Sequence, residues 1–163
     1  MNAFEQLLTM SESEKASSGI HYTPAEIAQQ PEMWLQMAEI LAEQRERIQA
    51  FLREAGLTGD KEATGLLSGA GSSEYIGNAV SYGLRKCLKR QAISVATTDF
   101  ITHPQSFLVK GHGYVVISFA RSGNSPESVA TYKLVKQLAP KTRQIVITCN
   151  KDGALAKITE QDE

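Results

Sequence analysis

The chain has 163 residues, among them 17 basic and 18 acidic side chains, so its formal net charge is −1. A chain of this length can bury one hydrophobic core. Balanced charge provides no basic surface for nucleic acid or an acidic membrane, and no apolar run approaches the roughly 20 residues of a membrane-spanning helix. The first residues, Met1–Glu5, lack the basic and apolar parts of a signal peptide. We therefore expect a cytoplasmic protein without a nucleic-acid or membrane partner.

Cysteine and histidine show no pattern of a disulfide or metal site. The two cysteines are too few for a disulfide scaffold and lack metal-ligand spacing. Cys87 is expected to be a small core residue on a helix. Cys149 lies at the end of a predicted strand, where it is either a buried structural thiol or a residue that reaches the site. The three histidines are scattered, and His103 either touches a substrate or is an ordinary loop residue. We expect no metal and no cofactor.

The N-terminal third of the chain is predicted to be helical. Residues 1–22 indicate a short helix and then a flexible polar arm, and residues 23–56 indicate further helices. Thr23 is predicted to cap the first of these and to form a capping box with Glu26. Gly56 is predicted to end the last, long helix. The apolar side chains of that helix recur at a spacing typical of a core or subunit interface; they are Met33, Trp34, Met37, Ile40, Leu41, Ile48, Phe51 and Leu52.

Strands and helices alternate from residue 57 onward. Continuous apolar runs such as Val115–Ile117 indicate strands buried on both faces, which is typical of a parallel sheet with helices on each side. We expect an α/β domain over residues 57–163 that is incomplete at its C-terminus, because no fifth strand follows, and whose open edge a partner would cover. The predicted strands are residues 63–68, 92–97, 114–119 and 144–148, and the predicted helices are residues 73–89 and 126–138, with a loop at 98–104 and another helix after residue 153.

Two short loops rich in glycine and serine follow the first and third predicted strands. Loop 1 is residues 68–73 and loop 2 is residues 122–128. In a parallel sheet such loops lie at the carboxyl ends of the strands, beside helix N-termini whose free N–H groups and positive dipole attract anions. Glycine lets the backbone approach a ligand closely, and serine hydroxyls add donors. The pattern predicts that both loops bind one phosphate group.

Loop 2 carries the more specific pattern. Ser125 is a good N-cap residue and Pro126 suits the first helical position. Ser122 and Asn124 add side-chain donors. Arg121, which precedes the loop, either contacts the phosphate or forms a surface salt bridge. The alternative for the whole loop is a structural role, in which the serines only cap the helix and form the turn.

Loop 1 also permits a different interpretation, as part of a dinucleotide site. Gly69 and Gly71 match the first two glycines of the dinucleotide-binding motif, and Asp99 follows the second predicted strand as the ribose-binding acid would. The third glycine of the motif is replaced by Glu74, whose carboxylate would repel a pyrophosphate. A nicotinamide-dependent oxidoreductase domain is therefore the less favoured hypothesis.

Three segments resemble the sugar isomerase (SIS) domain family: residues 67–73 (LSGAGSS), 117–128 (ISFARSGNSPES) and 147–150 (ITCN). Residues 22–31 (YTPAEIAQQP) and 97–100 (TTDF) narrow the resemblance to the bacterial galactosamine-6-phosphate deaminases/isomerases, also called tagatose-6-phosphate ketose/aldose isomerases. The resemblance implies a flavodoxin-like, three-layer α/β/α fold that binds the phosphate of a sugar. With Arg121 added, the candidate phosphate-binding residues are Gly71, Ser72, Ser73, Arg121, Ser122, Gly123, Asn124 and Ser125.

The resemblance also implies an activity. Enzymes of this family have two such domains per chain, and the second supplies a catalytic glutamate and a histidine. This chain is therefore expected to carry the phosphate-binding half of a phosphosugar isomerase/deaminase, acting on an aldose or amino-sugar 6-phosphate such as galactosamine 6-phosphate. Glu74 and Glu127 lie near the loops, but each is expected to be a helix-start residue, so no catalytic residue is assigned.

The expected partners are a sugar phosphate and either further copies of this chain or a second SIS-containing chain. A non-catalytic, sugar-phosphate-binding regulatory module is the alternative function.

Overall fold

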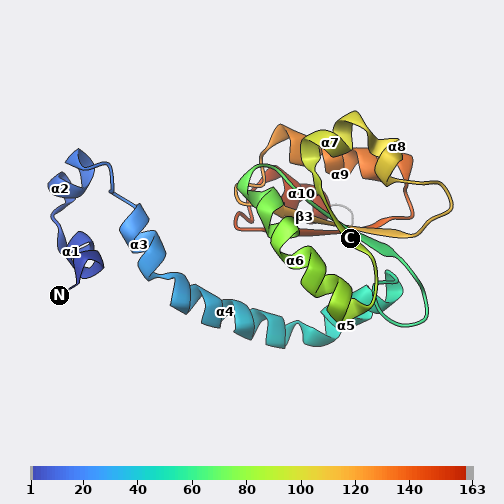
Figure 1. Cartoon of the computed structure of the whole chain (residues 1–163), viewed down its shortest axis with the longest axis horizontal. Helices are drawn as coiled ribbons and strands as arrows, with labels where there is room; N and C mark the ends of the chain where they lie inside the picture. The colour runs from blue at the N-terminus through green and yellow to red at the C-terminus, as the bar shows by residue number, and fades with distance from the viewer. Residues whose placement is uncertain (1, 161–163) are drawn as a thin grey trace. The chain divides into compact units, whose positions relative to one another are not determined.

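The structure is a computed structural model that describes residues 2–160. The chain divides into two compact units, one that extends to Ile48 and one that begins at Gln49 (Figure 1). Within the described residues, no helix has both the length and the apolar character needed to cross a membrane.

The N-terminal unit consists of helices. Asn2 caps the first and Ser11 the second, and in each case the third helical residue, Glu5 or Glu14, accepts a hydrogen bond from the cap backbone. The Ser11 hydroxyl, together with its backbone N–H, holds the pKa of Glu14 below its usual value. A second helix therefore occupies part of the segment that was predicted to be an arm. The helices are α1 (Ala3–Thr9), α2 (Glu12–Ser17), α3 (Thr23–Ala28), α4 (Gln30–Glu43) and α5 (Arg45–Glu54), which continues into the second unit.

The predicted cap of α3 is wrong. Thr23 is the first helical residue, and Tyr22 holds the N-cap position without a side-chain cap hydrogen bond. Glu26 forms no capping box; its carboxylate accepts a hydrogen bond from the Gln29 side chain at 2.6 Å. Because the helix begins one residue earlier than a Thr23 cap requires, Thr23 is itself helical and its hydroxyl is not placed to accept from the first-turn amides.

The predicted long helix is two helices, since α4 ends at Glu43 and α5 begins at Arg45. Gly56 adopts φ +88° just after α5, as the predicted helix end requires. None of the residues of α4 is buried, and the Trp34 side chain is 67% exposed. The apolar stripe predicted for a core or interface therefore stays exposed along α4.

The second unit is built on a four-stranded sheet in which every strand pair is parallel. The strands lie in the order β2-β1-β3-β4, and β1 is in register with β3, with Gly69 opposite Phe119. The strands are β1 (Thr64–Gly69), β2 (Ala92–Ala96), β3 (Tyr114–Ala120) and β4 (Arg143–Thr148), and the helices are α6 (Ser72–Leu88), α7 (Thr97–Thr102), α8 (Pro104–Phe107), α9 (Pro126–Leu138) and α10 (Ala154–Glu160).

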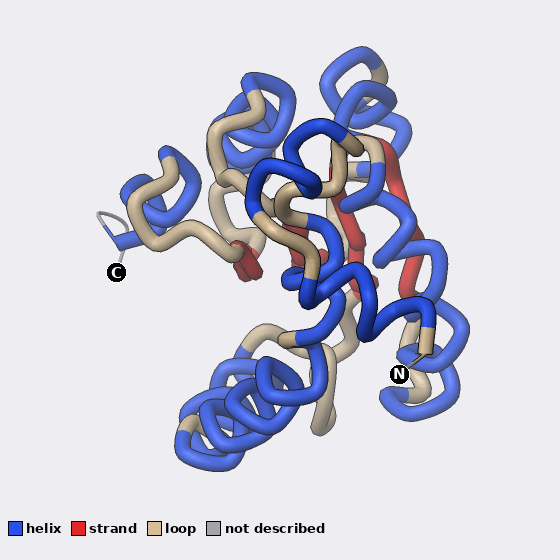
Figure 2. The backbone as a smooth tube through the Cα atoms, turned by 90° about the vertical axis from the view of Figure 1, so that its left-hand side faces the viewer, coloured by secondary structure: helices blue, strands red, loops and turns tan. Residues whose placement is uncertain are grey.

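Helices cover both faces of this sheet (Figures 1 and 2). On the face of α7 and α9, the buried core consists of Leu66, Val95, Phe100, Val116 and Val135. On the face of α6, Leu67, Ala92 and Phe119 form a second core cluster. Side chains of neighbouring residues in a strand point to opposite faces of the sheet, so Leu66 and Leu67 pack against different helix layers. The predicted parallel, three-layer α/β/α architecture is confirmed.

Three details of this unit differ from the prediction. α7 replaces most of the loop predicted after β2, because one helical turn brings Phe100 into the core, where it is fully buried. Cys87 is exposed rather than buried, since the inward face of α6 follows Gly77 and Ser81. Cys149 is also exposed and forms no disulfide.

Candidate functional site

Loop 1 and loop 2 lie side by side at the carboxyl edge of the sheet. They follow β1 and β3, which are neighbours in the strand order, and lead into α6 and α9 on opposite faces. The strand order reverses between β1 and β3, and in open parallel sheets a crevice opens at this reversal because the flanking loops turn away from each other. The two loops thus adjoin, as predicted, because the strands they follow are neighbours at the point where the strand order reverses.

A hollow of about 100 Å³ opens between the two loops. It has room for only a few water molecules, each of which takes about 30 Å³, whereas sites for whole small molecules measure about 300–1,000 Å³. The hollow therefore suits one small group, such as a phosphoryl group, and not an entire sugar. Its lining residues are Ala70, Ser72, Ser73, Phe119, Ala120, Arg121, Ser122, Ser125 and Ser128.

Loop 1 holds its serines at the start of α6 through two glycines. A Cβ on Gly69 would lie 2.5 Å from the carbonyl carbon of Ser73, so only glycine lets the first turn of α6 pack this closely on the end of β1. Gly71 occupies the N-cap position of α6 with φ +56°. Ser72 and Ser73 follow as the first helical residues, where the helix dipole favours an anion, and the Ser73 N–H donates to the Ala70 carbonyl at 3.2 Å.

Loop 2 presents hydroxyls at the start of α9. Ser125 is the N-cap residue, as predicted, but its side chain makes no cap hydrogen bond. Ser128, one helical turn later, is only 3% exposed and also lines the hollow. The Ser122 hydroxyl accepts a hydrogen bond from the Asn124 amide at 3.3 Å. In the described part of the chain no carboxylate forms an ion pair with Arg121, which lines the hollow as its one cation.

Five of the eight predicted phosphate-binding residues line the hollow: Ser72, Ser73, Arg121, Ser122 and Ser125. The other three, Gly71, Gly123 and Asn124, do not. The Asn124 Oδ1 instead accepts a hydrogen bond from the Ala154 amide at 2.9 Å.

Sequence reasoning missed four lining residues, Ala70, Phe119, Ala120 and Ser128. Ser128 could have been predicted, because a residue three positions after Ser125 lies on the same side of a helix.

Charge within the hollow favours an anion. No acidic residue is among the lining residues, and the N-termini of α6 and α9 add partial positive charge. Glu74 and Glu127 lie in the first turns of these helices without lining the hollow. The residues that the structure describes contain no group of three potential metal ligands.

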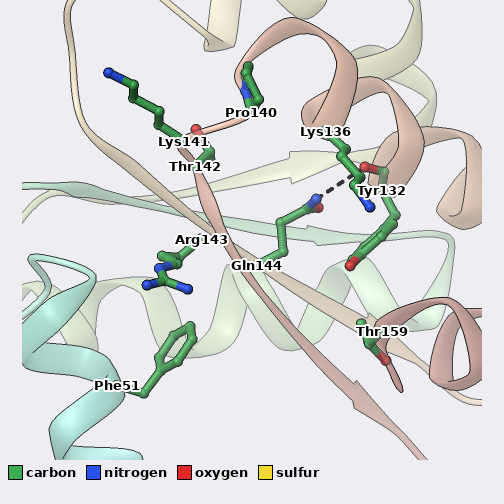
Figure 3. Close-up of a pocket in the computed structure, with 9 residues that line it drawn as sticks. All are labelled: Phe51, Tyr132, Lys136, Pro140, Lys141, Thr142, Arg143, Gln144 and Thr159. Atoms are coloured by element: carbon green, nitrogen blue, oxygen red, sulfur yellow. Dashed lines mark hydrogen bonds between the residues drawn. The ribbon is translucent and has the colours of Figure 1, made fainter. Parts of the chain in front are cut away.

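A larger cavity, of about 640 Å³, lies at the opposite end of β4 (Figure 3). Arg143 and Gln144 at the start of the strand line it, and the Gln144 side chain donates a hydrogen bond to the Tyr132 carbonyl at 3.1 Å. Lys136 and Lys141 also line it. Ligands of open parallel sheets bind at the carboxyl ends of strands, so the smaller hollow is the candidate site.

The sequence and the fold have counterparts in known proteins. Residues 61–161 match the SIS domain. The D-galactosamine-6-phosphate deaminase of Shewanella sp. (strain ANA-3) is 35% identical over 152 residues, covering 91% of this chain and 39% of that protein. The Escherichia coli protein of the same name is 37% identical over 134 residues, covering 82% of this chain and 34% of that protein.

A crystal structure shows the same likeness. That of tagatose-6-phosphate ketose/aldose isomerase from Escherichia coli superposes with a TM-score of 0.79 at 34% identity, covering 85% of this chain and 37% of that one. The chain thus spans between about a third and two fifths of the length of these relatives. Since the family model covers more than half of the chain, the chain belongs to the SIS domain family.

Proposed function

We propose that the hollow between loop 1 and loop 2 binds the phosphate group of a sugar phosphate. The observation that carries this proposal is that serines of both loops, Ser72 and Ser73 from one and Ser122 and Ser125 from the other, line one anion-sized hollow that lacks acidic residues. Arg121 adds the charge for a charge-assisted contact. In this proposal the backbone at Gly71, Gly123 and Asn124 completes the phosphate-binding set.

The proposed activity is that of a phosphosugar isomerase/deaminase, of which this chain carries the phosphate-binding half in residues 57–163. An example is the conversion of galactosamine 6-phosphate and water to tagatose 6-phosphate and ammonia, and the names of the relatives support it. Such a reaction removes a proton beside the carbonyl or imine carbon and returns it to the neighbouring carbon. Because the phosphate is remote from these carbons, its binding orients the sugar and supplies binding energy to the reacting end.

The proposal assigns no base in this chain. Glu74 and Glu127 are acids close to the loops, and neither lines the hollow. The base is therefore expected from another domain or chain, either a further copy of this chain or a second SIS-containing protein. We place the reaction in the cytoplasm, as expected for a sugar phosphate. We also propose that residues 1–22, as an arm, and residues 23–56, as helices, lie outside the domain.

A second function is a non-catalytic module that binds a sugar phosphate and regulates another activity. The favouring observation is the lining itself, which consists of hydroxyls, small and apolar side chains and one arginine, without a candidate general base. Such a lining can hold a phosphate but cannot by itself move a carbon-bound proton.

One experiment separates these functions. The protein is incubated with galactosamine 6-phosphate while ammonia and ketose phosphate are assayed, and its thermal unfolding is followed with and without sugar phosphates. Turnover eliminates the binding-only module. Stabilisation by sugar phosphates without turnover supports it, and stabilisation by NAD alone would overturn both proposals in favour of a dinucleotide site.

A further inference from the structure

We propose that the loop between β4 and α10, residues 149–153, holds loop 2 in its phosphate-binding conformation, with Asn150 and Gly153 as positioning residues. This inference rests on the proposed function of the hollow. Neither residue lines the hollow. Three kinds of contact join the β4–α10 segment to loop 2: Asn150 makes the first, Gly153 makes the second, and the first turn of α10 makes the third.

The first contact is a side-chain hydrogen bond across 28 positions of the sequence. The Asn150 Nδ2 donates to the Ser122 carbonyl at 2.9 Å. The Oδ1 of the same amide accepts from the Asp152 N–H at 3.0 Å, so both ends of the side chain are engaged. A carbonyl oxygen carries partial negative charge and would repel a phosphate, and this hydrogen bond keeps the Ser122 carbonyl directed toward Asn150. The Ser122 residue can then offer its hydroxyl to the hollow.

The second contact is close backbone packing between two glycines. A Cβ on Gly153 would lie 2.6 Å from the Ser122 carbonyl oxygen and 3.1 Å from the Gly123 Cα. Gly123 is buried and has φ +68°, a conformation that favours glycine. A side chain at Gly153 therefore forces a shift against loop 2 at Ser122, which lines the hollow, and at Gly123.

The third contact caps the next helix with loop 2. The Asn124 Oδ1 accepts from the Ala154 N–H at 2.9 Å, and the Gly123 carbonyl accepts from the Leu155 N–H at 3.0 Å. These amides belong to the first turn of α10, where no carbonyl of the same helix can accept from them. Leu155 is fully buried, so the helix that loop 2 caps is itself fixed to the core.

Different groups of loop 2 therefore contact the β4–α10 segment and line the hollow. Its carbonyls at Ser122 and Gly123 and the Asn124 side chain are bound to the β4–α10 segment. Ser122 and Ser125 themselves line the hollow. Loss of the outer contacts is therefore expected to reduce phosphate affinity without removing any group that touches the phosphate.

The test compares Asn150→Ala and Gly153→Ala with the wild type. A matched control is Gly83→Ala, since a Cβ on Gly83 of α6 would have no atom within 4 Å apart from its chain neighbours and the nearby backbone of its own helix. Binding of galactosamine 6-phosphate is measured by calorimetry, and amide signals of loop 1 and loop 2 are followed by NMR. We expect each variant to bind at least tenfold more weakly and Gly83→Ala to bind as the wild type does. In Asn150→Ala, the ligand should still shift loop 1 amides while loop 2 amides shift little.

The outcomes separate this inference from the proposed function. If the wild type binds no sugar phosphate, the proposed function fails; the NMR spectra without ligand then still show whether loop 2 is altered in Asn150→Ala. If the wild type binds the sugar phosphate and both variants bind it as tightly as the wild type does, the positioning role is overturned. Equal loss of the response in both loops, with a lowered melting temperature, would also overturn it, because it would indicate general destabilisation. Asn150→Ala keeps the test usable if Gly153→Ala does not fold.

Discussion

Removing one hydroxyl from each loop tests whether the loops share a ligand. We expect Ser73→Ala and Ser125→Ala each to weaken sugar-phosphate binding while leaving the fold intact. Both residues line the hollow, Ser73 from the start of α6 and Ser125 from the start of α9. The Ser125 hydroxyl makes no cap hydrogen bond, so its loss removes little from α9.

The magnitude follows from the kind of contact. Loss of a hydrogen bond to a charged group costs about 1–3 kcal/mol, which corresponds to about a 5- to 150-fold rise in Kd. An N-cap serine that does bond its helix contributes about 0.5–2 kcal/mol to stability. Because Ser125 makes no such bond, we expect a change below about 0.5 kcal/mol, the range of ordinary surface substitutions. In a chain of this length that is a melting shift below about 2 °C.

Calorimetric titration with galactosamine 6-phosphate gives the affinities of both single variants and of the double variant. Ser106→Ala, at an exposed serine of α8, is the matched control. If both hydroxyls contact one phosphate, the double variant departs from the sum of the single effects, as expected for residues that share a partner. Wild-type affinity in both single variants would refute the site. If Ser73→Ala weakens binding and Ser125→Ala does not, the idea that both loops bind the same phosphate is refuted.

Three further predictions use other features of the site. Gly69→Ala is expected to lower the free energy of unfolding by about 1–3 kcal/mol, because its Cβ would lie 2.5 Å from the Ser73 backbone; chemical denaturation beside Gly83→Ala measures this, and unchanged stability contradicts the close packing. Arg121→Gln is expected to weaken sugar-phosphate binding and reduce its salt dependence, which titration at two ionic strengths checks; unchanged binding removes Arg121 from the site. Affinity should fall about tenfold from pH 8 to pH 5, because the second pKa of a phosphate monoester is about 6 and the dianion is the better ligand; a flat calorimetric profile contradicts dianion binding.

Elements with strong local signals could be predicted from the sequence. Apolar runs such as Val115–Ile117 identified the strands to within one or two residues, and Ser125-Pro126 marked the start of α9. Five residues of the hollow were identified because the loops combine strand ends, glycine and hydroxyl side chains. In these places local propensity and tertiary structure favour the same conformation.

The features that were missed depend on contacts between distant residues. α7 has β-branched residues that favour helix weakly, and it forms where Phe100 enters the core. The roles of Asn124 and Asn150 depend on partners 30 and 28 positions away. No local pattern separates an asparagine that caps a distant helix from one that contacts a ligand. Only the assembled sheet edge makes this distinction.

The site itself depends on strand order, which local sequence patterns do not specify. Strands that alternate with helices are equally compatible with a sheet in which β2 lies between β1 and β3. Neighbouring strands are about 4.8 Å apart, so that order would separate the two loops by roughly twice this distance. In the observed order β1 and β3 are adjacent, and right-handed crossovers that run outward in opposite directions place α6 and α9 on opposite faces. Two helix N-termini consequently flank one hollow, and a shared phosphate requires that arrangement.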